Sequence, residues 1–408
     1  MNPLRRPPLR CIVDTNVLVT AAGANEAASP ACVEASIRAL RDIVNHGHVF
    51  IDDVGRIIAE YRGAIDLSGK TDTGEEFLEW LIENEYNPAR VTRVPLTSKP
   101  GDENDFVELP APPAEVQYDP SDRKFLAVAV AHPDHPPILQ TLDSKWWGWR
   151  EALAAVGVHI HFLCPSEIAR KFYEKMGAPM EFFRFPRTPH LAWLGAGQPR
   201  DDKVLSPAEA EELLQQTVTV EEKLDGANLG LSLDGTGDIR AQNRGAYLEL
   251  DSLHPQFRPL RQWLAQHRFR LIDTLTPELI VFGEWCYAMH SVPYTRLPDW
   301  FIGFDIYDRS AGEFWSVERR DRLMEALGIA VVPRLARGQL QLHQLLRLLD
   351  NSLFGDGPAE GLYVRVDKDG RLVQRAKLVR AEFTQAIGEH WSRQAIRPNS
   401  RIPTDGSW

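Results

Sequence analysis

The chain has 408 residues, of which 43% are hydrophobic, and its formal net charge is −11. This length favours two domains that each bury a core of their own. The acidic balance argues against a protein that binds polyanions over its whole surface, and no apolar run reaches the length of a membrane span.

The first residues of the chain and its cysteines indicate in which cellular compartment the protein works. Residues 1–8 include basic side chains but no secretory apolar core, so we expect a cytoplasmic protein. The four cysteines are scattered and form no CxxC pair. This spacing favours four reduced thiols over a zinc site or a disulfide framework.

Strands and helices alternate through residues 1–165. We expect strands at 9–13, 48–52, 137–142 and 158–164, and helices at 29–44, 54–61, 75–84, 122–132 and 146–156. Such alternation favours a three-layer α/β domain, in which a parallel sheet is covered by helices on both faces. The acidic, proline-rich residues 99–113 predict a surface loop, and residues 166–184 predict a linker helix.

Four acids stand at the ends of these predicted elements. Asp14 and Asp143 each follow a strand, Glu60 ends a helix, and Asp122 opens a helix. Open α/β sheets bind ligands at the carboxyl ends of their strands. Four carboxylates gathered there would repel one another unless a hard cation such as Mg²⁺ or Mn²⁺ lay between them. The sequence therefore predicts a metal site.

With the Asp-Thr-Asn run at 14–16 as its most recognisable element, the region 10–164 resembles the PIN domain, a family of metal-dependent ribonucleases. The resemblance implies that the four acids hold the metal and activate a water for attack on an RNA phosphodiester. Glu34 is an alternative second acid. Many PIN domains carry one more acid where this chain has Lys145, so a catalytically inactive module that docks RNA or a protein stays open as an alternative.

Short alternating strands dominate from residue 217 onward. We expect strands at 218–223, 229–233, 279–285, 301–307, 361–366 and 372–378, and helices at 260–267 and 340–349. This pattern predicts an α+β domain with mainly antiparallel sheets, spanning residues 185–408.

One lysine stands at the end of the predicted strand 218–223. Lys223 opens the run Lys-Leu-Asp-Gly-Ala-Asn, and a strand end beside a tight glycine turn exposes such a lysine to a phosphate. Lys-x-Asp-Gly is the nucleophile motif of enzymes that carry AMP or GMP on a lysine nitrogen. Alone, the pattern is short enough to arise by chance in a surface turn.

Further motifs follow in order, and with them the region 185–379 resembles the covalent nucleotidyltransferase superfamily, specifically an RNA ligase branch similar to phage RNA ligase 2. The resemblance implies an adenylation domain in which Lys223 attacks ATP. It also implies nucleotide-binding roles for eight residues: Glu222, Asn228, Arg244, Glu284, Phe304, Glu360, Arg375 and Lys377.

The implied roles differ among these residues. Arg244 contacts phosphates, as do Arg375 and Lys377, while Glu284 lies near the ribose and Glu360 near a metal. An aromatic side chain from 301–306 stacks on the adenine, with Phe304 favoured and Phe301 as the alternative. The chain departs from the family pattern at two positions. Asn243 stands before Arg244 where the family has a serine, and Arg375 stands in place of the first lysine of the last motif. Arginine keeps the positive charge there and can bind phosphate.

Together the two halves predict an RNA-processing or repair enzyme. The expected activity is ATP-dependent sealing of 5′-phosphate and 3′-OH RNA ends, with RNA as partner, ATP and Mg²⁺ or Mn²⁺ as cofactors, and a PIN-like endoribonuclease in front. Two further alternatives for the second half are a DNA ligase and a capping-type enzyme that transfers GMP.

Overall fold

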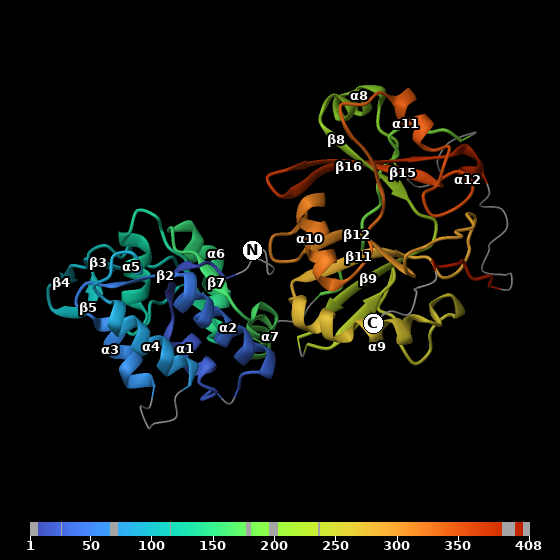
Figure 1. The fold of residues 1–408 in the computed structure, drawn as a ribbon. Coiled ribbons are helices and arrows are strands. Elements are labelled where there is room, and N and C mark those ends of the chain that lie inside the picture. The colour runs from blue at the N-terminus through green and yellow to red at the C-terminus, as the bar shows by residue number, and fades with distance from the viewer. Residues whose placement is uncertain are drawn as a thin grey trace. The chain divides into compact units, whose positions relative to one another are not determined.

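The computed structural model describes residues 7–25, 27–65, 72–114, 116–176, 181–195, 203–235, 237–385 and 396–402. The chain divides into two compact units, residues 3–178 and 179–408 (Figure 1). No described helix combines the length and the apolar character needed to cross a bilayer.

The first unit is built on a five-stranded sheet in which all neighbouring strands are parallel. Its strands, in spatial order, are β3 (Val91–Val94), β2 (His48–Asp52), β1 (Arg10–Val13), β6 (Ile138–Gln140) and β7 (Ile160–Phe162). All residues of β2 and β6 are buried, which explains their apolar character in the sequence. The predicted parallel α/β sheet is confirmed.

Helices lie on both sides of this sheet (Figure 1). The structure gives α1 (Thr15–Ala21), α2 (Pro30–His46), α3 (Arg56–Ala64), α4 (Thr73–Asn84), α5 (Arg123–Ala131), α6 (Ser144–Ala155) and α7 (Pro165–Met176). Helix α7, which the sequence predicts as a linker, packs against α6. The predicted loop at 99–113 instead begins as a short hairpin of β4 (Ser98–Lys99) and β5 (Asp102–Phe106).

The prediction of four reduced thiols was wrong for two cysteines. Cys32, near the start of α2, forms a disulfide with Cys164, which precedes α7. The two residues are 132 positions apart, so only the fold brings them together and no local spacing reveals the pair. Cys11 and Cys286 are free and buried.

The second unit contains two antiparallel sheets, which confirms the predicted sheet type. One sheet has the order β10 (Ile239–Gln242), β9 (Ala227–Leu233), β11 (Leu279–Trp285), β12 (Phe301–Asp308) and β13 (Glu313–Phe314). The other has the order β14 (Arg334–Gly338), β8 (Val218–Lys223), β15 (Gly361–Lys368) and β16 (Arg371–Val379). The chain passes from one sheet to the other in the turn between β8 and β9.

The helices of this unit are α8 (Pro207–Gln215), α9 (Leu260–Thr274), α10 (Val317–Leu327), α11 (Leu342–Leu348) and α12 (Ala381–Gln385). Helix α8 begins with a capping box in which the Ser206 side chain accepts from the Glu209 amide and Glu209 accepts from the Ser206 amide. Helix α9 packs against α10 and covers the β9–β11–β12 sheet through a core that includes Trp263 and Leu271.

Candidate active site

Lys223 is the last residue of β8, and strand alternation decides what surrounds it. One face of the β8–β15–β16 sheet builds an apolar core with Val220, Leu362 and Leu378. The alternate residues share the other face, and they are polar: Glu221, Lys223, Tyr363, Arg365, Arg375 and Lys377. The lysine therefore stands in a row of charged and hydroxyl groups.

The turn after Lys223 approaches the second sheet closely because residue 226 is glycine. A Cβ atom on Gly226 would lie 2.7 Å from the carbonyl oxygen of Trp285 and 3.0 Å from Cγ of Glu284. Such contacts are too short for real side chains, so any other residue would push the turn away from β11. The close approach places Glu284 near enough to Lys223 for their charges to interact.

Two partly buried carboxyl groups, those of Glu360 and Glu284, lie near the Lys223 amine. Lys223 Nζ donates to Glu360 Oε2 at 2.5 Å, and neither side chain is more than a fifth exposed. Burial alone would lower the pKa of Lys223, but the negative charges of Glu360 and Glu284 raise the pKa above its ordinary value. The resting lysine is therefore an ammonium ion, which must lose a proton before it can attack.

The site has more carboxyl groups than this one ammonium pairs with. Burial raises the pKa of Glu284 to about 8, against the lowering effect of Lys223 and with a further rise from Glu360. Mg²⁺ is commonly held by one or two carboxylates together with substrate phosphates. The oxygen donors of Glu284 and Glu360 fit such an ion.

Removing the charge of Glu360 should lower the pKa of Lys223. In a Glu360→Gln variant, the burial that lowers the pKa of Lys223 stays while the largest raising charge is lost, so the pKa falls. We expect Lys223 to react with an amine-acylating reagent at lower pH than in the wild type, measured by mass spectrometry of the labelled peptide across a pH series. The matched Glu318→Gln variant, at an exposed glutamate, should leave the labelling curve in place.

Asn228 and Lys377 also lie beside the lysine. Asn228 is directly opposite Glu284 in the pairing of β9 with β11, and its buried Oδ1 has no hydrogen-bond partner among the described residues. Lys377 is opposite Tyr363, and its charge acts on Glu360. A free amide oxygen and a cation suit a nucleotide's polar groups and phosphate.

Tyr363 belongs to the same group but was missed in the sequence. The charges of Lys223, Glu284 and Glu360 all act on its buried hydroxyl, and burial raises the pKa of Tyr363. The available signal was its position two residues after Gly361, on the strand face that carries the site.

Glu222 and Arg244, which the sequence also predicts to bind the nucleotide, have no recorded contact with Lys223 among the described residues. Glu222 is fully buried on the opposite face of β8, where it accepts hydrogen bonds from Ser352 Oγ at 2.5 Å and from the Leu353 amide at 2.9 Å. Arg244 is exposed on the turn after β10, and no hydrogen bond or ion pair joins it to another described residue. Their roles stay predictions.

The two candidate aromatic side chains are both buried. Phe304 is 6% exposed and packs edge-on against Phe185, with ring centroids 5.3 Å apart, and lies 6.4 Å from Tyr363. Phe301 packs against Trp263 in the separate core beneath α9. Phe304 is thus the one that neighbours the lysine through Tyr363, and adenine stacking stays a prediction for it.

A buried ionic network continues the polar face away from Lys223. Arg320 donates two hydrogen bonds to Glu221, at 2.6 and 3.1 Å, and Arg365 joins Glu221 to Asp305. Arg375, predicted to bind phosphate, forms an ion pair with Asp305. Binding of a phosphate by Arg375 would therefore compete with this carboxylate.

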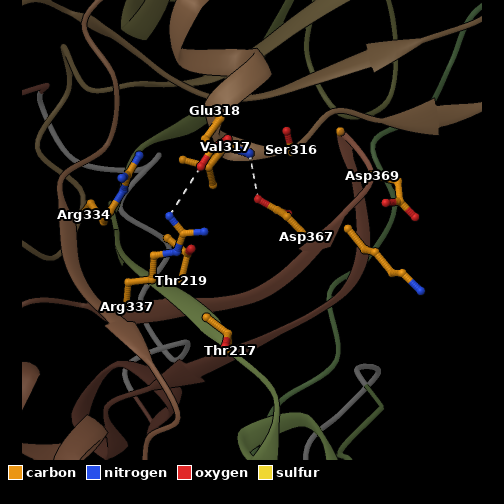
Figure 2. Close-up of a pocket in the computed structure, with 11 residues that line it drawn as sticks. Thr217, Thr219, Ser316, Val317, Glu318, Arg334, Arg337, Asp367 and Asp369 are labelled. Carbon is orange, nitrogen blue, oxygen red and sulfur yellow. Dashed lines mark hydrogen bonds and ion pairs between the residues drawn. The ribbon is translucent and has the colours of Figure 1, made fainter.

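A hollow of about 210 Å³ lies at the start of β8, at the other end of the strand from Lys223 (Figure 2). Two contacts join residues of its lining: Arg337 pairs with Glu318 at 3.4 Å, and Asp367 accepts from the Val317 amide at 2.7 Å. Asp367 thereby supplies an acceptor for the first turn of α10. These contacts join α10 to strands β14 and β15 of the sheet.

The structure gathers the four predicted acids of the first unit around Asp14. Asp14 is 3% exposed and begins α1, where its Oδ1 accepts from the Asn16 amide at 2.8 Å. Burial raises the pKa of Asp14 to about 7, and the charges of Asp122, Glu60 and Asp143 add to the rise. The alternative acid Glu34 is exposed on α2 and pairs with Arg38 instead.

Two lysines form ion pairs with acids of this cluster. Lys145 contacts Asp122 at 2.8 Å and Asp143 at 3.3 Å, and Lys124 pairs with Glu60. Among the residues that the structure describes, no group of three or more His, Cys, Asp or Glu side chains is arranged to hold a metal ion. Lys145 lies between two of the four predicted ligands, so a divalent cation at Asp122 and Asp143 would compete with this ammonium group, and the metal site stays a prediction.

Removing one of these lysines should create a metal site. We expect Lys145→Ala to bind Mn²⁺ at least about tenfold more tightly in the first unit, because the carboxylates of Asp122 and Asp143 lose their cation. Titration calorimetry with MnCl₂ measures the change. The double variant Lys145→Ala with Asp14→Asn should lose the added binding, and an unchanged affinity in the single variant would contradict the prediction.

Comparison with known proteins finds a similarity in the second unit. A family model described as RNA ligase matches residues 216–379, which include the Lys223 site. No curated protein matches the chain.

Solved structures of a Naegleria gruberi RNA ligase are similar to this chain. One, with PPi, has 22% identity and a TM-score of 0.35 over 43% of this chain and 53% of that chain. Mutants with ATP and Mn (20% identity, TM-score 0.33, 43% and 53% coverage) and with AMP and Mn (18%, 0.34, 52% and 66%) also match. The chain spans about half the length of the first of these ligases.

Proposed function

We propose that the second unit is an ATP-dependent RNA ligase that seals 5′-phosphate and 3′-OH ends through a lysyl-AMP intermediate. The observation that carries the proposal is Lys223, partly buried beside Glu360 and Glu284, within a region that matches the RNA ligase family model. A polar sheet face with Lys377 and an unpartnered Asn228 oxygen supports nucleotide binding beside it.

The proposed reaction has three steps. Lys223 Nζ, once deprotonated, attacks the α-phosphorus of ATP, so that an N–P bond forms and pyrophosphate leaves. The AMP group then passes to an RNA 5′-phosphate, which breaks the N–P bond and returns the lysine. Finally the 3′-OH attacks the activated 5′-phosphate, AMP leaves, and a phosphodiester remains.

The residues around Lys223 have distinct parts in this scheme. Glu360 holds the ammonium in the resting protein and accepts its hydrogen bond. Lys377 offers a positive charge to the developing negative charge on the α-phosphate. Glu284 and Glu360 would hold a Mg²⁺ or Mn²⁺ ion, which supplies charge stabilisation at the phosphates when bound.

The test uses α-labelled ATP and GTP with the full chain, followed by nicked RNA and nicked DNA duplexes. A covalent adduct with ATP and joined RNA support the proposal. An adduct with GTP alone would favour capping chemistry, and joining of DNA in preference to RNA would favour a DNA ligase. No adduct with either nucleotide would refute the assignment of Lys223.

A second candidate function is the PIN-like endoribonuclease of the first unit. The observation that favours it is the convergence of four acids at the carboxyl end of a parallel sheet. The lysines among those acids favour the alternative, a module that docks RNA or a protein. Incubating internally labelled RNA with Mn²⁺ decides between them: cleavage that Asp14→Asn removes supports the nuclease, and no cleavage in either form supports docking.

A further inference from the structure

The segment 396–402 lies along the loop 286–297, which follows β11 in the second unit. Five backbone hydrogen bonds of 2.8–3.1 Å join them: Met289 N to Arg397 O, Asn399 N to Tyr287 O, Ser400 N to Tyr294 O, Leu297 N to Ser400 O and Ile402 N to Leu297 O. The segment therefore holds this loop as an added strand would, although it comes from a distant part of the sequence.

One side chain of the segment, Asn399, binds backbone groups in both halves of the loop. Asn399 is 7% exposed, and its Nδ2 donates to the carbonyl oxygens of Cys286 at 2.8 Å and Ala288 at 3.4 Å. Its Oδ1 accepts from the Tyr294 amide at 2.9 Å. Both N–H donors and the oxygen of the Asn399 amide thus bind backbone groups of the loop.

The loop in turn fixes the residue two positions after the nucleophile. Asp225 Oδ2 accepts from the Ser291 amide at 2.6 Å and from the Val292 amide at 3.0 Å. The Asp225 amide donates to the Tyr294 hydroxyl oxygen at 2.7 Å. Tyr294 is 2% exposed, so its hydroxyl is held in place by packing. The turn that carries Lys223 is therefore tied to the loop through both backbone and side chain.

We propose that Asn399 is a positioning residue for nucleotide transfer by Lys223, acting through Tyr294 and Asp225. The inference rests on the proposed ligase function. Loss of the Asn399 amide leaves the Tyr294 amide and the Cys286 carbonyl buried without their partners, and the loop shifts to satisfy them. The Lys223 turn follows, and a displacement of about 1 Å at a reacting group can slow a reaction about 100-fold.

The test compares full-chain Asn399→Ala with Arg401→Ala, a matched control in the same segment. Arg401 pairs with Asp299 at 3.2 Å and lies over the ring of Trp300, 4.6 Å from its centroid, and has no recorded hydrogen bond with Tyr294 or Asp225. We expect Asn399→Ala to lower the rate constant of lysyl-AMP formation about 10- to 100-fold, with the apparent ATP affinity within about threefold of wild type. Arg401→Ala should stay within about twofold in both quantities.

A second variant keeps the test decisive if Asn399→Ala does not fold. Tyr294→Phe removes only the hydroxyl that accepts from Asp225, and we expect the same loss of rate with unchanged ATP affinity. In the double variant the two losses should not add, because both act through one loop.

The outcomes separate this inference from the proposed function. A wild-type protein that forms no lysyl-AMP overturns both. A wild type that forms the adduct, with Tyr294→Phe or a folded Asn399→Ala at the wild-type rate, overturns the positioning role alone. A loss that appears only as weaker ATP binding also overturns it.

Discussion

Replacing Lys223 by alanine is expected to abolish both the labelled nucleotide adduct and the joining of RNA ends. Lys223 donates a hydrogen bond to Glu360, whereas Lys377, whose charge also acts on that carboxyl, lies on β16. Removing the covalent nucleophile leaves ATP with no group to accept AMP, so the loss should be complete within the detection limit of the assay. The measurement is a denaturing gel of protein incubated with α-labelled ATP, beside a joining assay.

The same experiment needs a lysine that is remote from the site. Lys203→Ala is suitable, since Lys203 is 67% exposed and pairs with Glu209 at the start of α8. It should give the wild-type adduct yield. Joining of RNA that carries a preformed 5′-adenylate tests the last step separately, and Lys223→Ala should retain part of this activity. An adduct of normal yield on Lys223→Ala would show that another residue is the nucleophile.

Replacing Glu221 by alanine is expected to lower the free energy of unfolding of the second unit by about 3–5 kcal/mol, because it leaves Arg320 and Arg365 buried without their shared carboxylate. Urea unfolding monitored by tryptophan fluorescence measures the change. Glu318→Ala provides a control, because Glu318 is exposed and pairs with Arg337 at the surface. Its loss should change the free energy of unfolding by only about 0–1 kcal/mol. Similar losses in the two variants would contradict the prediction.

This contribution also depends on pH. Burial raises the pKa of Glu221, but Arg320 and Arg365 outweigh it and hold the pKa below its ordinary value. A carboxylate with a depressed pKa in the folded state stabilises the protein fully above its ordinary pKa and loses that effect as pH falls through the folded pKa. The difference between wild type and Glu221→Ala should therefore be largest near neutral pH and shrink on acidification.

Elements with a strong local pattern could be predicted from the sequence. The strands β2, β8 and β11 have the predicted bounds, because each is a compact run of buried or alternating residues between turn signals. Helix α10 was missed, since Val317–Leu327 is rich in charge and its buried Arg320 interrupts the apolar face. The short strand β3 was missed because four residues carry too little pattern.

In the candidate site, too, residues in local motifs could be predicted and long-range contacts could not. Lys223, Glu284 and Glu360 could be named in advance because each lies in a short motif, and the structure brings them together. The pairing of Lys145 with Asp122 and the hold of Asn399 on the loop depend on residues 23 and 105 or more positions apart. Such contacts follow from strand register and long-range packing, for which a single sequence has no local signal.

The resting pair between Lys223 and Glu360 gives the proposed reaction a proton balance. The lysine begins as an ammonium ion and ends as an uncharged phosphoramidate nitrogen, so loading it with AMP expels a proton to solvent. Mass action then makes mildly alkaline solution favour the loaded protein, whereas acid together with pyrophosphate drives the nucleotide back off. A protein purified at low pH should therefore carry less AMP than the same protein purified at high pH.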